Sequence, residues 1–271
     1  MDGQVHAADA TVGRVGRDRE AGSGAAVLEP RAHGPAERFL GVVGDRHPVV
    51  AFLVAVLVGY VLLAAASTAV GLLVTEALLD SRAVERLDER LPRWLAGQRT
   101  ETLTDLSWVG SELAGGYVIP ATIGLVALVM VALRRYRIAA FVLFAVAVES
   151  AVYRTTTFVV ERERPQVERL ESLPPEASYP SGHTAAAIAL YSGLVLLLGS
   201  RFGGGGTSVG LWVAALSIPP LVGLARMYRG MHHPLDVLAG VPIGIAAIVV
   251  VVFACRVAGA AAARREAAEA R

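Results

Sequence analysis

The feature that most constrains this chain is a series of long apolar runs. Residues 49–74 contain no charged side chain. At about 1.5 Å of rise per residue, a helix over this run can cross a hydrocarbon core of roughly 30 Å with some tilt. Because 54% of the 271 residues are apolar and fall in such runs, the chain is predicted to be a multi-pass membrane protein.

Five further apolar runs follow, and each is predicted to be a membrane-spanning helix. They lie at residues 114–133, 138–160, 184–199, 209–225 and 235–255. The predicted fold class is therefore all-α, with a six-transmembrane-helix bundle over residues 48–257. Residues 1–47 are rich in Gly, Ala and Arg and lack a signal-peptide core, so they are predicted to be a disordered cytoplasmic tail. Residues 258–271 are predicted to be a cytoplasmic C-terminal tail.

Residues 83–98 differ from the spans because their apolar side chains recur on one helical face only. Arg and Glu residues fill the other face. This pattern predicts a short amphipathic helix between spans one and two. Such a helix either lies on the membrane surface, with Trp94 at the interface, or packs on the ends of neighbouring spans.

Six spans put both chain termini on one side of the membrane. The Arg-rich turn at residues 134–137 and the C-terminal Arg residues share that side, which the positive-inside rule makes cytoplasmic. The loops at residues 161–183 and 226–236 are separated by two spans, so both are predicted to emerge on the extracytoplasmic face of the cell (inner) membrane. These two loops hold the main polar clusters, and topology allows them to form one site.

The charge composition narrows the classes of partner. A net charge of +1 gives no support to a nucleic-acid partner. All 25 basic residues are Arg, and Arg stays charged and binds phosphate oxygens through two N–H groups at once. The single Cys255 excludes an intramolecular disulfide and a multi-Cys metal site.

The first polar loop begins with Arg162 and Arg164 and ends with Ser181 and His183. The two Arg residues fit either snorkelling membrane anchors or ligands of an anion. Ser181 is a natural N-cap, and the helix start behind it offers free N–H groups and a positive dipole end. His183 would lie beside an anion bound there, although an ordinary capped helix with an incidental His has the same sequence.

The second polar loop contains Arg226, Arg229, His232, His233 and Asp236. His232 and Asp236 are four residues apart at a helix start, so the carboxylate can reach the imidazole. A carboxylate on one ring nitrogen fixes the tautomer and leaves the other nitrogen as a nucleophile or base. The same residues also fit a capped, solvated helix entrance. Two adjacent His residues suggest a metal, but metal sites usually need three or four ligands, so none is predicted.

Together these clusters resemble the phosphatidic acid phosphatase type 2 superfamily, which also includes vanadium haloperoxidases. The family pattern is a Lys seven residues before an Arg-Pro pair, then Pro-Ser-Gly-His, then Ser-Arg, five residues, His, three residues and Asp. Arg164 and residues 180–183 match the first two parts, and Arg226, His232 and Asp236 match the third. The resemblance extends over roughly residues 50–255, including the six-span layout.

Two positions depart from the family pattern. Thr157 stands in the place of the Lys, and Ala225 stands in the place of the Ser before Arg226. Thr157 can give phosphate a hydrogen bond but no charge. Arg154, one helical turn earlier, is predicted either to replace the missing cation or to pair with Glu149 or Glu161 inside the bundle.

The resemblance implies a phosphatase that needs no metal and no cofactor. His232 would attack phosphorus and form a phosphohistidine, oriented by Asp236, while His183 would act as general acid and base. The implied phosphate-binding residues are Arg164, Ser181, Gly182, Arg226 and Thr157, with Arg162 as an outer partner. A site at the membrane interface favours a lipid phosphate whose tail stays in the bilayer. Candidates are phosphatidic acid, phosphatidylglycerol phosphate, an undecaprenyl diphosphate and a lipid-linked sugar phosphate.

Two alternatives to a lipid phosphatase stand beside it. A catalytically weak or inactive family member would act as a lipid-phosphate-binding or transport protein, and Thr157 favours this reading. Transporters place polar residues at mid-membrane, whereas the polar residues here lie at span ends. Vanadate-dependent haloperoxidase chemistry is disfavoured by the six apolar spans, because the resembling haloperoxidases are soluble.

Overall fold

The computed structural model describes residues 25–172, 177–202 and 206–270. Every regular element in these ranges is a helix, as predicted for an all-α chain. In chain order the elements are η1 (Ala26–Leu28), α2 (Pro35–Val43), α3 (Pro48–Leu73), η2 (Val74–Leu78), α4 (Arg82–Gly97), α5 (Glu101–Glu112), α6 (Val118–Ala132), α7 (Tyr136–Val159), α8 (Gly182–Ala187), η3 (Ile188–Ser192), α9 (Gly193–Phe202), α10 (Gly206–Tyr228) and α11 (Pro234–Glu269).

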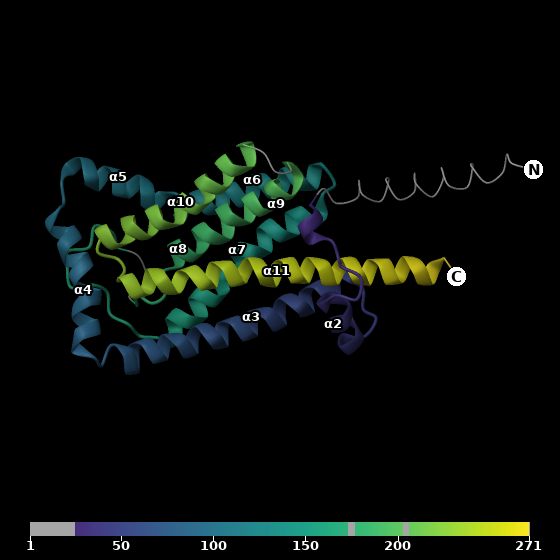
Figure 1. Cartoon of the computed structure of the whole chain (residues 1–271), viewed down its shortest axis with the longest axis horizontal. Coiled ribbons are helices and arrows are strands. Elements are labelled where there is room, and N and C mark those ends of the chain that lie inside the picture. Colours follow the sequence, from purple (N-terminus) through teal and green to yellow (C-terminus); the bar gives the residue numbers. More distant parts are fainter. Residues whose placement is uncertain (1–24, 173–176, 203–205, 271) are drawn as a thin grey trace, which may run out of the picture.

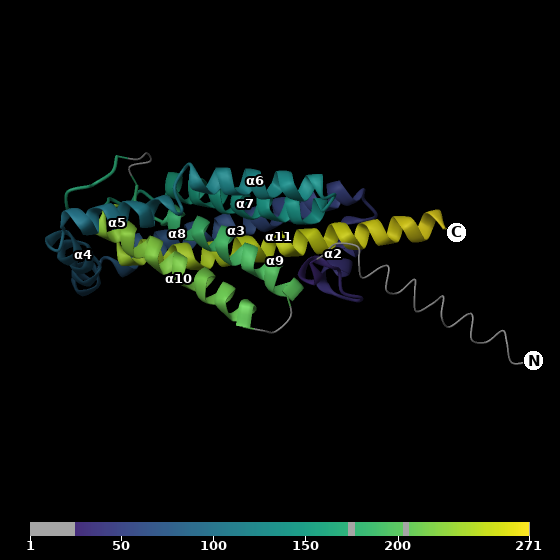
Figure 2. The ribbon, with the colours of Figure 1, turned by 90° about the horizontal axis from the view of Figure 1, so that it is seen from above.

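Helix α11 lies at the centre of the bundle (Figures 1 and 2). It packs along α3 and also contacts α7 and α8. Its buried residues recur every three or four positions, the period of a helical stripe that faces a core. Ala247, Val251 and Ala254 in this stripe are fully buried, and their small size lets the neighbouring helices approach closely.

Two glycines bring the first turns of α11 against α8. A Cβ atom on Gly240 would lie 2.6 Å from the carbonyl oxygen of Ser181. A Cβ atom on Gly244 would lie 2.5 Å from the carbonyl oxygen of Ala185. Neither position can accept a side chain unless the backbone moves. This close approach holds the start of α8 beside the start of α11, the two helix entrances that carry the predicted motifs.

Five helical segments are long and apolar enough to cross a membrane. They are Pro48–Leu78, Tyr136–Val159, Gly182–Gly199, Val209–Tyr228 and Pro234–Glu269. They correspond to the predicted spans one, three, four, five and six. Helix α6, in the place of the predicted second span, has 15 residues. At about 1.5 Å per residue it is roughly 22 Å long, shorter than the other five.

Helix α4 lies across the end of the bundle at which α11 begins (Figure 1). Burial does not follow the predicted apolar face of this segment, since Asp88 and Leu95 are buried whereas Leu87 and Trp94 are exposed. A carboxylate oxygen of Asp88 accepts a hydrogen bond from the backbone N–H of Leu235 at 2.9 Å. The helix therefore packs on the start of α11, and its exposed Trp94 is also compatible with the other predicted arrangement, at the membrane surface. Helix α5, which follows, was not predicted.

The predicted N-terminal tail is partly ordered. Residues 1–24 lie outside the described residues, but residues 35–43 form α2, which packs against α11. Leu28 and Leu40 are almost fully buried, so disorder is the wrong prediction for this stretch. The apolar side chains of residues 25–47 are too sparse to form a span, yet they pack against α11 near its C-terminal end. The C-terminal segment continues α11 to Glu269 as a polar helix extension.

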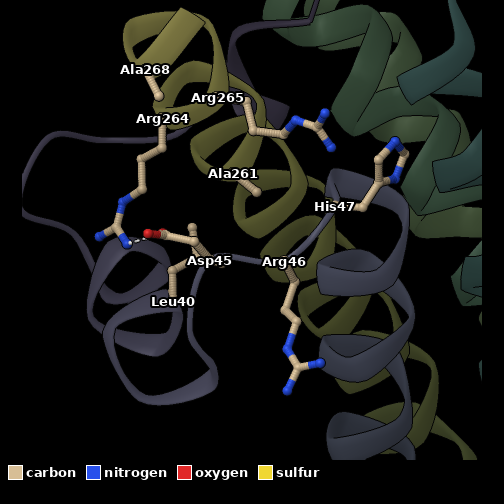
Figure 3. Close-up of a pocket in the computed structure, with 8 residues that line it drawn as sticks. All are labelled: Leu40, Asp45, Arg46, His47, Ala261, Arg264, Arg265 and Ala268. Atoms are coloured by element: carbon tan, nitrogen blue, oxygen red, sulfur yellow. Dashed lines mark hydrogen bonds and ion pairs between the residues drawn. The ribbon is translucent and has the colours of Figure 1, made fainter.

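A small cavity of about 210 Å³ lies where α2, the start of α3 and the end of α11 meet (Figure 3). Its lining contains three Arg side chains and one Asp, and Arg264 pairs with Asp45 at 3.2 Å. None of the predicted site residues lines it. The cavity is lined by Ala261 and Ala268 near the end of α11, whereas the motif residue Asp236 lies in its first turn.

Candidate active site

The two polar loops meet at the α4 end of the bundle, as the topology predicted. Arg162, from the first loop, forms an ion pair with Asp236 at the start of α11. Arg164 donates to the backbone carbonyl of Met231 at 2.5 Å. The carbonyl of Ser178 contacts the ring of His232. Residues that are far apart in the sequence therefore form one buried cluster.

His232 is buried and held in one tautomer. Its Nδ1 lies 2.7 Å from the carbonyl oxygen of Ser178. Because a carbonyl oxygen can only accept, Nδ1 carries the proton and Nε2 has the free lone pair. Burial lowers the pKa of His232 to about 4, so the ring is neutral at neutral pH. The structure thus presents His232 as a neutral imidazole whose Nε2 can attack or accept a proton.

His233, the adjacent histidine, is arranged differently. Its Nε2 lies 2.8 Å from a carboxylate oxygen of Glu89 on α4, and its Nδ1 lies 3.3 Å from Asp236. Both ring nitrogens therefore face carboxylates, and neither has a free lone pair directed at a substrate. This contrast separates the two neighbouring histidines, of which the family pattern matches only His232.

Asp236 does not make the contact predicted for it. Its nearest carboxylate oxygen is 3.8 Å from Nδ1 of His232, too far for a hydrogen bond. One oxygen pairs with Arg162, and the other accepts from the backbone N–H of His233 at 2.8 Å. Arg162 pairs with Asp88 as well, so α4 is tied to the start of α11. The predicted orienting role of Asp236 is taken in this structure by the carbonyl of Ser178.

Ser178 is fixed by its own hydrogen bonds to the start of the same loop. Its backbone N–H donates to the carbonyl of Arg162 at 2.7 Å, and its hydroxyl donates to the carbonyl of Glu163 at 2.8 Å. The residue is fully buried. Because the contact to His232 uses a main-chain oxygen, no side-chain pattern in the sequence could have indicated it.

Two arginines of the motifs lie together beside His232. Arg226 and Arg164 are both buried, and burial together with the charge of Arg226 lowers the pKa of Arg164. Nη1 of Arg226 donates to the hydroxyl of Ser111 at 2.7 Å and to Glu171 at 2.5 Å. Its Nε–H is buried and has no hydrogen-bond partner among the described residues. A buried donor of this kind is costly unless a ligand oxygen satisfies it.

The motif at residues 180–183 forms the predicted helix start. Ser181 is the N-cap of α8, and its hydroxyl accepts from the N–H of Thr184 at 3.5 Å. Gly182 packs against an aromatic ring, since a Cβ there would lie 3.0 Å from Tyr153. His183, in the first turn, is within electrostatic range of Arg226, His232 and Arg164. The capped helix start therefore faces the same cluster as the second loop.

Thr157 is buried, but its hydroxyl donates to the carbonyl of Tyr179 at 3.2 Å. It therefore supports the loop rather than offering a donor to an anion. Arg154 is exposed, and the described residues include no hydrogen-bond or ion-pair partner for it. The prediction that Arg154 replaces the missing cation, and the alternative that it pairs with Glu149 or Glu161, both disagree with this placement.

Replacing Arg154 with Ala is expected to leave turnover of a phosphate substrate within about twofold, because Arg154 faces outward from the span α7, where a long Arg side chain can reach the membrane interface, and it has no partner in the cluster. The matched comparison is Arg164→Ala, which removes a buried guanidinium from the cluster. The two variants are compared by initial rates of phosphate release from the same substrate. A loss of activity in Arg154→Ala as large as that in Arg164→Ala would contradict this placement.

Several residues of the cluster were not predicted. Helix α5 contributes Ser111 to Arg226, and its Ser107 hydroxyl accepts from Arg229 at 3.0 Å. Glu171 and Asp88 supply carboxylates to the arginines. The only sequence signal for these residues was indirect: buried arginines need counter-charges. Within the described residues, no group of three or more His, Cys, Asp or Glu side chains is arranged to hold a metal ion.

Comparisons with known proteins agree with this arrangement. Residues 138–258, which contain all the motif residues, match the model of the PAP2 superfamily. An undecaprenyl-diphosphatase of Sulfolobus acidocaldarius is 30% identical over 145 residues, which are 51% of this chain and 64% of that protein. The chain thus spans a little under two thirds of the length of this curated relative.

The fold is also similar to a solved structure. The crystal structure of a transmembrane PAP2-type phosphatidylglycerolphosphate phosphatase from Bacillus subtilis aligns with a TM-score of 0.59 and 23% identity. The alignment covers 76% of this chain and 94% of that one. The match over residues 138–258, together with the three motifs in one buried cluster, makes this chain similar to the PAP2 superfamily.

Proposed function

We propose that this chain is a membrane phosphatase that removes phosphate from a lipid phosphate or lipid diphosphate through a phosphohistidine on His232. The observation that carries the proposal is the state of His232. It is buried and neutral, Ser178 holds the proton on Nδ1, and Nε2 is left with its lone pair. A fixed, neutral imidazole beside two buried arginines is suited to attack an anionic phosphorus centre.

In the first step Nε2 of His232 forms a bond to phosphorus as the bond from phosphorus to the leaving oxygen breaks. His183 gives its proton to the leaving alkoxide, or to the leaving phosphate of a diphosphate. In the second step His183 takes a proton from a water molecule, which attacks the phosphohistidine. Inorganic phosphate leaves, and Nε2 of His232 recovers its lone pair.

The charge of the reacting group is balanced by the surrounding cations and amides. Arg164 and Arg226 would bind the equatorial oxygens, with the unpartnered Nε–H of Arg226 as one donor. Ser181 and the backbone N–H of Gly182 would add donors from the start of α8. Asp236, 3.8 Å from Nδ1, would stabilise the cationic ring of the phosphohistidine by Coulomb attraction without a hydrogen bond.

The proposed membrane arrangement has six spans, with α6 counted as the second. The five longer spans and the apolar α6 support this number. The Arg-rich turn between α6 and α7 and the C-terminal Arg residues support a cytoplasmic location for both termini. The site would then lie on the extracytoplasmic face of the cell membrane. The exposed Trp94 and Leu87 of α4 would lie at the membrane surface.

A lipid substrate is supported by a large open cavity beside the cluster. It measures about 1120 Å³, and its lining includes Thr157, Arg162, Arg164 and the exposed Phe158. Three Arg and three Glu side chains line it, so its charge is balanced, and the support for a lipid comes from Arg164 and the exposed Phe158, which suit an anionic head and an apolar tail. The names of the relatives put an isoprenyl diphosphate and phosphatidylglycerolphosphate first among the candidates. A second candidate function is lipid-phosphate binding without turnover, which the loss of a Lys at Thr157 favours.

The test is phosphate release by the purified chain from undecaprenyl diphosphate, phosphatidylglycerolphosphate and phosphatidic acid, each with EDTA present. At least one of these lipids is expected to release inorganic phosphate at the same rate with and without EDTA, because arginines and amides supply the positive field. Release that needed an added metal ion would contradict the metal-independent mechanism. Binding of the lipids without any release would favour the binding protein instead.

A further inference from the structure

Arg226 already has an anionic partner, and this partner lies outside the three motifs. One carboxylate oxygen of Glu171 accepts from Nη1 of Arg226 at 2.5 Å, and the other accepts from Nε of Arg229. Burial alone would raise the pKa of Glu171, but the two guanidinium groups outweigh it and lower the pKa. Glu171 is therefore a charged carboxylate bound to the cation that the proposed function assigns to phosphate.

A phosphoryl group bound at Arg226 would meet the charge of Glu171. The guanidinium of Arg226 is only 1% exposed, so solvent screens the two anions poorly. With Glu171 in its present place, the phosphoryl oxygens and the carboxylate would share one guanidinium and repel each other. A phosphate at Arg226 would therefore bind more tightly if Glu171 moved away from Arg226 or lost its charge.

The side chain of Glu171 can move while its backbone stays in place. The neighbouring Leu170 is held to Arg229 by two separate hydrogen bonds: its N–H donates to the carbonyl of Arg229 at 3.1 Å, and its carbonyl accepts from Nη2 at 3.3 Å. Arg229 also donates to Ser107 at 3.0 Å. A cavity of about 480 Å³ is lined by residues 169–172 and Val167, which gives the Glu171 side chain room to rotate.

We propose that Glu171 is an affinity-determining residue: its carboxylate is the resting counter-ion of Arg226, and it competes with a substrate phosphate that displaces it. This inference rests on the proposed function, in which Arg226 binds the phosphoryl group. The exchange keeps the buried guanidinium paired both before and after substrate enters. Because Thr157 supplies no charge where the family pattern has Lys, a single carboxylate offsets a larger share of the positive charge in this chain.

The experiment measures binding of phenylphosphonate, a dianion that cannot be hydrolysed as an ester, to the purified full chain by calorimetry at neutral pH. Glu171→Gln keeps the length of the side chain and one acceptor oxygen but removes the charge. Its Kd is expected to fall about tenfold or more, because the competing charge next to Arg226 is gone. Glu171→Ala, which removes the charge and the acceptor, is expected to give a similar gain, so either folded variant decides the question.

The matched control is Glu168→Gln, in the same loop. Glu168 is exposed and lies 3.8 Å from Arg99, away from Arg226, so its substitution makes the same change in charge without touching the cluster. Its Kd is expected to stay within about twofold of wild type, because solvent and salt screen an exposed charge. The proposal would be overturned if Glu168→Gln gained as much affinity for phenylphosphonate as Glu171→Gln. It would also be overturned if both Glu171 variants bound phenylphosphonate no more tightly than wild type.

Because the readout is binding, this result is separate from the test of turnover. A chain that released phosphate from no lipid but gained affinity on Glu171→Gln would contradict the phosphatase proposal and support the counter-ion. A chain that hydrolysed lipid phosphates but showed no gain would support the phosphatase proposal and overturn the counter-ion.

Discussion

Replacing His232 with Asn is expected to lower kcat by about 10⁴-fold or more, because the proposed nucleophile is lost. Asn is the informative substitution, since its amide nitrogen can take the place of Nδ1 and still donate to the carbonyl of Ser178. Nothing takes the place of Nε2. The hydrogen bond at 2.7 Å is thus preserved while the attacking atom is removed. The rate of phosphate release from the best lipid substrate measures the effect.

His233→Asn is the matched control, because it makes the same chemical change one residue away. His233 lies between Glu89 and Asp236, so its substitution is expected to loosen the contact between α4 and α11. The kcat is expected to fall about tenfold or less, as for a residue that supports the site without reacting. If His233→Asn were as inactive as His232→Asn, the assignment of the nucleophile to His232 would lose its basis.

Replacing His183 with Ala is expected to give the second largest effect. The kcat for lipid phosphomonoesters is expected to fall about 10²- to 10⁴-fold. An alkoxide is a poor leaving group and needs a proton from His183. With p-nitrophenyl phosphate the first step needs no such proton, because p-nitrophenolate leaves unaided. The variant is therefore expected to form phosphoenzyme from this substrate and to hydrolyse it slowly, since the second step also needs a base.

The difference between fast formation and slow hydrolysis of the phosphoenzyme can be seen in a stopped-flow trace of nitrophenolate release. A burst equal to the amount of enzyme, followed by a slow phase, is the expected trace for His183→Ala. Equal losses with the lipid phosphomonoester and with p-nitrophenyl phosphate in the first turnover would show that His183 does not act as the acid.

The sequence predicted the parts of the structure that depend on the pattern of apolar residues and on the number of membrane spans. Uncharged runs such as residues 49–74 have few alternatives to a membrane span, and five of the six predicted spans match long apolar helices. The meeting of the two polar loops followed from counting spans. The pairing of Arg162 with Asp236 and the contact of Ser178 with His232 confirm it.

The rest of the site depends on contacts that a sequence does not encode locally. The orienting group for His232 is a main-chain carbonyl, which every residue carries. It is Ser178 that supplies it, because Ser178 is hydrogen-bonded to the carbonyls of Arg162 and Glu163. Helix α5 mixes polar and apolar residues without a clear stripe, because one side faces Arg226 of α10 and Arg229, which follows that helix. Arg154 lies near Thr157 in helical spacing, yet the two residues differ in burial. Sequence distance alone could not separate them.

The central claim is the covalent phosphohistidine, and its most direct test is to trap it. Purified chain is mixed with a lipid phosphate carrying radiolabelled phosphorus, denatured in alkali within the first turnovers, and digested for peptide mapping. The expected label is stable in base and lost in acid, lies on the peptide that contains His232, and is absent from His232→Asn. Turnover without any protein-bound label, or a label stable in acid, would contradict it.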